Sequence, residues 1–170
     1  FPAASGLYNC PTAVNNVETL CNLPSIITRG AAWFAALGPE KNGGPKLFCV
    51  SGHVKKPGVF EADMKTTLRS LIYDYAGGIR DGHQLKAVIP GGSSVPILLP
   101  NQLDAQASFD GVVKAGSMLG SAGAIVLDDT TCMVWLAKNL LHFYKHESCG
   151  KCTPCREGTD WLFKLLDKIE

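Results

Sequence analysis

The sequence predicts an α+β fold, and three features indicate it. Two short strand-like runs flank a hairpin signal near the middle of the chain. A helical pattern separates this pair from further strand candidates, and two amphipathic helical patterns fill the last quarter. Because strands and helices do not alternate along the whole chain, a doubly wound nucleotide-binding domain is excluded. We expect three parts, at residues 1–45, 46–129 and 130–170.

The composition limits the function classes. Hydrophobic residues make up 46% of the 170 residues and charged residues 18%, which suffices for one or two small soluble cores. The net charge is +1 and no basic stripe carries interleaved aromatic residues, so nucleic-acid binding is excluded. No apolar run approaches the ~20 residues of a membrane span, and we expect no direct membrane insertion. Seven cysteines without regular disulfide spacing favour a reducing compartment.

In residues 1–45, a helix is predicted to begin at the Asn-Asn pair 15–16. Either asparagine can cap the free amides, and Glu18 suits the positive end of the helix dipole. Pro24 is expected to end or kink this helix. A second short helix is expected over residues 26–37, before a linker rich in glycine and proline at 38–45.

The middle part has the pattern of a compact α+β unit. A Lys-Lys-Pro-Gly turn at 55–58 joins the first two strand candidates, and Thr67 opens a helix that Gly77-Gly78 closes. This order is compatible with a β-grasp. The strand candidates are residues 46–51, 58–62, 85–89, 95–99 and 124–127.

Two helices joined by a cysteine-rich loop are predicted for residues 130–170. Thr153 as N-cap and Pro154 at the first helical position would begin the second helix. The predicted apolar face of the first helix comprises Met133, Leu136, Ala137, Leu140, Leu141 and Tyr144, and that of the second comprises Gly158, Trp161, Leu162, Leu165 and Ile169.

The loop between these helices contains the most specific motif, a Cys-x2-Cys-x2-Cys run at Cys149, Cys152 and Cys155. Three thiolates at this spacing can reach one iron-sulfur cluster, and Gly150 and Pro154 suit the tight backbone path. Zinc in a Cys3His site is the competing interpretation, although zinc more often uses two separated ligand pairs. In-chain candidates for a fourth ligand are Cys132, His146, His142, Cys10, Cys21 and Cys49.

Other local patterns favour structural roles. Gly-Gly-Ser-Ser at 91–94 is interpreted as a turn, and the glycine-rich segment 116–123 lacks the dinucleotide-binding spacing. The Asp128-Asp129 pair is interpreted as capping groups, and His53 and His83 as loop residues. Packing roles are expected for the three tryptophans, Trp33, Trp135 and Trp161.

Three blocks carry a resemblance to a known family. They are CPTAVNNVETL at 10–20, Gly82 with LKAVIPGGSS at 85–94, and FYKHESCGKCTPCREG at 143–158. With these blocks the chain resembles the C-terminal half of the flavoprotein subunits of respiratory complex I, the 51 kDa or F-type subunits of NADH:quinone oxidoreductase. Because the blocks come from both ends and the middle, the resemblance covers essentially the whole chain.

The resemblance implies a function for each part. Residues 1–45 would be the tail of a flavin-binding α/β domain, residues 46–129 an SLBB-like β-grasp module, and residues 130–170 the start of a helical bundle that holds a 4Fe-4S cluster. Electrons would pass from NADH through FMN to that cluster, and no side chain of this segment would be a catalytic acid or base.

The resemblance also implies the site residues. Val14, Asn15, Asn16 and Thr19 would contact FMN, and the three cysteines of the loop would bind the cluster. The NADH site, most of the FMN site and the fourth cluster ligand would lie outside this chain.

The implied partners are the 24 kDa-type 2Fe-2S subunit and the large iron-sulfur subunit of the peripheral arm. The implied location is cytoplasmic and peripheral to the inner membrane, or on the matrix side in mitochondria. Two alternatives stay open at this point: a diaphorase subunit of an NAD-reducing hydrogenase or formate dehydrogenase, and a non-enzymatic β-grasp module with structural zinc.

Overall fold

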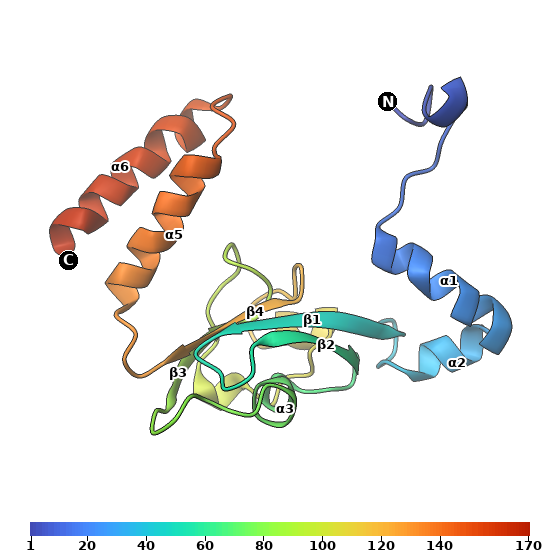
Figure 1. Ribbon diagram of the computed structural model, residues 1–170, viewed down its shortest axis with the longest axis horizontal. Helices are drawn as coiled ribbons and strands as arrows, with labels where there is room; N and C mark the ends of the chain where they lie inside the picture. Colours follow the sequence, from blue (N-terminus) through green and yellow to red (C-terminus); the bar gives the residue numbers. More distant parts are fainter.

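A computed structural model describes all 170 residues, and it confirms the α+β class. A four-stranded sheet forms the centre of the molecule, and two helical arms extend from its opposite ends (Figure 1). The first arm contains η1 (Leu7–Asn9), α1 (Val17–Arg29) and α2 (Ala31–Ala36). The second contains α5 (Met133–Glu147) and α6 (Thr153–Ile169). No helix combines the length and apolar character needed to cross a bilayer.

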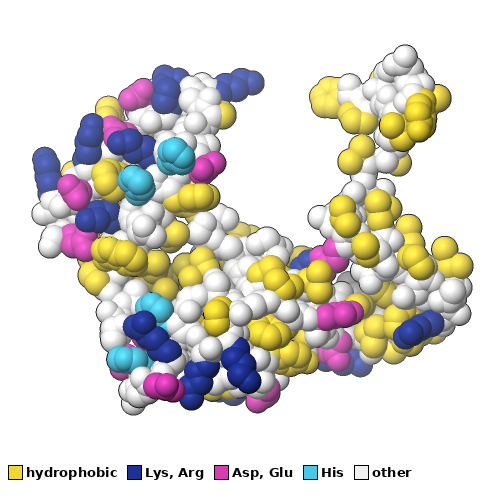
Figure 2. Space-filling model, viewed as in Figure 1, with side chains coloured by type: hydrophobic (Ala, Val, Ile, Leu, Met, Phe, Trp, Pro, Cys, Tyr) yellow, Lys and Arg dark blue, Asp and Glu magenta, His cyan; other side chains and the backbone are white.

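The two arms stand apart and expose apolar side chains (Figure 2). On the first arm these include Val17, Leu20, Leu23 and Ile27 of α1, which are between 45% and 80% exposed. The second arm exposes Trp161, Leu162, Leu165 and Ile169 of α6. The predicted apolar face of α6 is therefore left largely uncovered within this chain.

Helix α1 begins where the sequence predicts and ends later. The side chain of Asn16 caps it by accepting a hydrogen bond from the N–H of Glu18 at 2.8 Å. Pro24 lies inside the helix, so of the two predicted outcomes, an end or a kink, the end is wrong. Proline removes only one intrahelical hydrogen bond, whereas Gly30 has a φ of 89°, which readily suits only glycine. The helix therefore stops just before Gly30.

The sheet has strand order β2-β1-β4-β3. Its strands are β1 (Pro45–Gly52), β2 (Gly58–Asp63), β3 (Leu85–Ile89) and β4 (Gly123–Asp128). The outer pairs, β1 with β2 and β3 with β4, are antiparallel. The central pair, β1 with β4, is parallel, with Cys49 opposite Gly123. This mixed sheet brings together strands that are more than seventy residues apart in the sequence.

The predicted strand at residues 95–99 is absent. Only Leu98 pairs with β3, because its N–H donates to the carbonyl of Val88 and its carbonyl accepts from the N–H of Val88. Pro96 and Pro100 have no N–H to extend the ladder. The predicted helix after Thr67 is present as α3 (Leu68–Ser70) followed by a π-helical turn, η2 (Leu71–Tyr75).

Short helices and loops cover one face of the sheet and enclose the main core. The sequence did not indicate α4 (Phe109–Lys114), a helix of six residues, nor the 3-10 turn η3 (Pro100–Gln102). The core is a cluster of 19 buried residues, which include Phe48, Leu68, Leu71, Ile72, Leu98, Leu103, Val112 and Val126. Residues 46–128 thus form a packed unit to which both arms are attached.

Helix α5 packs on the other face of the sheet through a second cluster. Leu136 belongs to one buried cluster with Ala87, Ile89 and Leu127 of β3 and β4, together with Val95. The hydroxyl of Tyr144 donates a hydrogen bond to Ser93 Oγ at 2.7 Å. The predicted turn at residues 91–94 therefore also binds helix α5 to this side of the sheet. Trp135 and Trp161 are 48% and 65% exposed, so the packing role predicted for them is wrong within this chain.

Candidate metal centre and flavin contact

The cysteine loop lies at the tip of the second arm, between α5 and α6 (Figure 1). Cys149 and Cys152 precede α6, and Cys155 lies in its first turn, as predicted. The N-cap of α6 is Cys152, not Thr153, so the helix begins one residue earlier than expected. All three thiols are exposed and free of disulfides. The loop thus presents three unblocked sulfur donors.

Arg156 fixes the path of this loop. Its Nη1 donates to the carbonyl of Gly150 at 2.7 Å, and its Nε pairs with Glu157 at 2.9 Å. Gly150 has a φ of 73°, the left-handed conformation that glycine adopts without strain. On the other side, Ser148 Oγ lies 3.4 Å from Cys155 Sγ and accepts from the N–H of Gly150. The loop is therefore pre-shaped by its own side chains.

The backbone of the loop retains unused donors. The N–H groups of Lys151, Cys152 and Thr153 donate no hydrogen bond within the chain. Backbone amides that point at cluster sulfurs stabilise the reduced cluster and tune its potential. Free amides beside three thiols match the needs of an iron-sulfur centre.

A second set of potential metal ligands lies outside the loop. The donor atoms of His83, Asp128 and Asp129 all lie within 4.8 Å of one another. The three loop cysteines are not part of this group.

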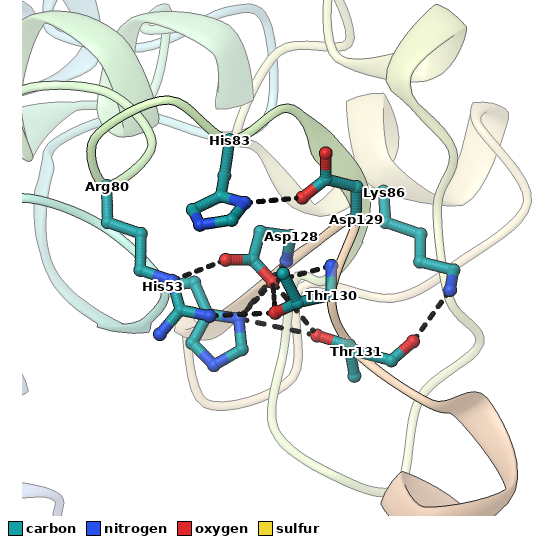
Figure 3. Close-up of polar contacts among 8 residues, drawn as sticks. All are labelled: His53, Arg80, His83, Lys86, Asp128, Asp129, Thr130 and Thr131. Atoms are coloured by element: carbon teal, nitrogen blue, oxygen red, sulfur yellow. Dashed lines mark hydrogen bonds and ion pairs between the residues drawn. The ribbon is translucent and has the colours of Figure 1, made fainter.

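That compact group already has a cation. Asp128 is fully buried, and its Oδ2 accepts a hydrogen bond from Nε of Arg80 at 2.5 Å (Figure 3). Its Oδ1 accepts from the hydroxyl of Thr130 at 2.6 Å and lies 2.8 Å from Nδ1 of His53. The guanidinium of Arg80 thus balances the charge of the one buried carboxylate of this group. The sequence predicts a capping role for Asp128 and a loop role for His53, and it gives no sign of this network.

Residues expected to contact FMN lie at the entrance to α1. Val14, Asn15, Asn16 and Thr19 are all exposed. Asn16 uses its side-chain oxygen to cap the helix, which leaves its amide nitrogen free. The side chains of Asn15 and Thr19 make no hydrogen bond within the chain. The segment therefore presents neutral donors at a helix N-terminus, an arrangement that suits a phosphate group.

Comparison with known proteins assigns two regions. Residues 46–126 match the SLBB domain, and residues 135–170 match the NADH-ubiquinone oxidoreductase-F iron-sulfur binding region. The second region contains all three loop cysteines. An F-type subunit of NADH-quinone oxidoreductase in Rhizobium meliloti (strain 1021) is 55% identical over 170 residues. The chain is a homologue of the F-type subunits of NADH-quinone oxidoreductase. The predicted family membership is confirmed.

The F-type subunit of NADH-quinone oxidoreductase in Mycobacterium tuberculosis (strain ATCC 25618 / H37Rv) is 54% identical to this chain. That alignment also covers all 170 residues of the chain. The chain spans about 40% of the length of these relatives. Among solved structures, an air-oxidized NAD+-reducing [NiFe]-hydrogenase matches 99% of this chain and 28% of its own, with a TM-score of 0.80 and 37% identity. The same fold therefore occurs in a second kind of NAD-linked enzyme.

Proposed function

We propose that this chain is part of the NADH-oxidising flavoprotein subunit of an NADH:quinone oxidoreductase. The cysteine loop carries the proposal, because three free thiols and unused amides lie within the region that matches the family's iron-sulfur binding region. When bound, FMN takes up the hydride of NADH, and a 4Fe-4S cluster takes up single electrons. The role of the protein is to hold both groups in place.

The residues of this chain divide that task. Cys149, Cys152 and Cys155 are the proposed cluster ligands, with a fourth ligand from outside residues 1–170. Val14, Asn15, Asn16 and Thr19 are the proposed FMN contacts, since their donors are exposed beside the N-terminus of α1. The NADH site and most of the FMN site are proposed to lie outside the chain. The proposed domain boundaries are 45/46 and 129/130.

The proposed partners are the 24 kDa-type 2Fe-2S subunit and the large iron-sulfur subunit of the peripheral arm. The proposed location is the cytoplasmic or matrix side of the membrane. The fold of the hydrogenase supports one alternative, a diaphorase subunit. We favour the quinone-linked enzyme because identity to its F-type subunits reaches 55%, against 37% for the hydrogenase.

The test is metal analysis of the full-length protein, purified without oxygen. We expect about four irons with matching sulfide, and an EPR signal after dithionite reduction. Cys152→Ser should abolish this signal, whereas Cys132→Ser, a matched control outside the loop, should keep it. About one zinc per chain and no EPR signal would instead establish the structural zinc module.

A further inference from the structure

Glu18 joins the first arm to the sheet. Its Oε1 accepts a hydrogen bond from the backbone N–H of Leu47 at 2.8 Å, and its Oε2 pairs with Nζ of Lys46 at 3.0 Å. Both side chains of the ion pair are partly buried, with 30% of Glu18 and 19% of Lys46 exposed. One carboxylate in the first turn of α1 thus binds two successive residues of β1.

The register of the sheet explains why a carboxylate is needed here. The N–H of Cys49 donates to the carbonyl of Ala122, just before β4 begins at Gly123. The N–H of Leu47 points to the same side, because donors two residues apart on a strand share a direction. Strand β4 does not extend to Leu47, so this donor lacks a strand partner. Glu18 supplies the missing acceptor.

No other polar contact joins α1 to the sheet. All other hydrogen bonds of residues 1–30 stay within residues 1–34, and α1 buries none of its residues. A cavity of ≈ 480 Å³ lies between α1 and the start of β1, beside the Glu18 contacts. Its lining includes Val17, Cys21 and Leu47. Without Glu18, the start of α1 would therefore have little to fix its position on the sheet.

Glu18 is also bonded to the segment proposed to contact the flavin. Its own N–H donates to Oδ1 of Asn16 at 2.8 Å, and Thr19 is its neighbour in the chain. Burial alone would raise the pKa of Glu18, but the hydrogen bonds from Leu47 and Lys46 hold it below its ordinary value. The carboxylate is thus ionised at neutral pH and available for both contacts.

We propose that Glu18 is a positioning residue for the flavin, which fixes the FMN-contact segment 14–19 to the start of strand β1 in the SLBB sheet. The proposal rests on the proposed function, in which that segment contacts FMN. Glu18 itself faces the sheet and needs no contact with the flavin. The SLBB domain then acts as the support on which one side of the flavin site is held in place.

The test measures FMN affinity of the flavin-depleted full-length protein by fluorescence quenching. Glu18→Ala should raise the Kd for FMN about tenfold, the equivalent of one or two lost hydrogen bonds. Glu18→Gln keeps an oxygen for the N–H of Leu47 and should raise the Kd only about two- to threefold. The matched control is Glu61→Gln, which removes a carboxylate from the same cavity without breaking a contact to α1. It should leave the Kd unchanged.

Two further measurements make the outcome decisive. The melting temperature of the flavin-free protein should be similar in all variants, since a general loss of structure would lower it with the affinity. Thr19→Val tests the flavin contact itself, because Thr19 makes no side-chain bond within the chain. If this variant weakens FMN binding and Glu18→Ala does not, the positioning role is overturned and the proposed function stands. If neither weakens binding, both the positioning role and the proposed FMN contact are overturned.

Discussion

Arg80 donates through Nε to Oδ2 of Asp128 at 2.5 Å, although the arginine side chain is 45% exposed and the aspartate is completely buried. Asp128 ends β4, and Arg80 lies in the loop before β3. Thr130 and His53 approach the other carboxylate oxygen (Figure 3). A buried charge is thus compensated by groups from three separate segments of the chain, directly ahead of α5.

Asp128→Asn should destabilise the protein. The amide cannot accept from all of the donors that surround this position, and the loss of charged hydrogen bonds should lower the free energy of unfolding by about 2–3 kcal/mol. Asp129→Asn is the matched control, because the exposed side chain of this residue bonds only His83 and the change should alter stability by less than ~0.5 kcal/mol. Urea unfolding of both variants measures the difference. Equal stability of the two variants would contradict a central role of Asp128.

The stability should depend on pH through the same residue. Burial alone would raise the pKa of Asp128, but bonds from Thr130 and Arg80 and the proximity of His53 hold it well below its ordinary value. A lowered folded-state pKa gives stability that is complete above the unfolded-state pKa of about 4 and is lost as pH falls toward the folded-state value. Urea titrations from about pH 6 to about pH 3 should therefore show a steeper loss in the wild type than in Asp128→Asn. Parallel curves would refute this assignment.

Sequence reasoning found the features that depend on neighbouring residues. The hairpin at β1 and β2, the capping of α1 by Asn16 and the cysteine loop all follow from local patterns. The network around Asp128 has no such signal, because His53 lies 75 residues away in the sequence and meets it only through the β1–β4 pairing. The sequence indicates Glu18 as a helix-end residue, but it carries no signal for the contact with Leu47, which lies 29 residues further along the chain.

Arg156 should affect the cysteine loop more than Lys151 does. Both cations lie in the loop region, but only Arg156 bonds the carbonyl of Gly150. We expect Arg156→Gln to lower the iron content of the full-length protein and to change its EPR line shape. Lys151→Gln, which removes one charge and no bond within the loop, should shift at most the midpoint potential. The same loss of iron in both variants would favour charge over the fixed loop geometry.

Gly91 should not tolerate a methyl group. A Cβ at this position would lie 2.3 Å from the carbonyl oxygen of Met118 and 2.4 Å from that of Leu119, and backbone atoms cannot move aside easily. Gly91→Ala should therefore cost about 1–3 kcal/mol of stability. At Gly158, inside α6, a Cβ would meet nothing within 4 Å, so Gly158→Ala should stabilise the helix by up to about 1 kcal/mol. Thermal melts of the two alanine variants test the opposite signs.

The parallel pairing of β1 and β4 fixes the distance between the points at which the two arms attach to the sheet. The first arm attaches at Pro45, the start of β1, and the second leaves at Asp128, the end of β4. The register of Gly52 opposite Val126 places Asp128 about nine residues beyond Pro45 along the strand direction, which is about 30 Å. Loops between these strands can lengthen or shorten without changing that interval. Adding residues to both central strands would move segment 14–19, the proposed flavin contact, away from the cysteine loop by about 3.3 Å for each residue added.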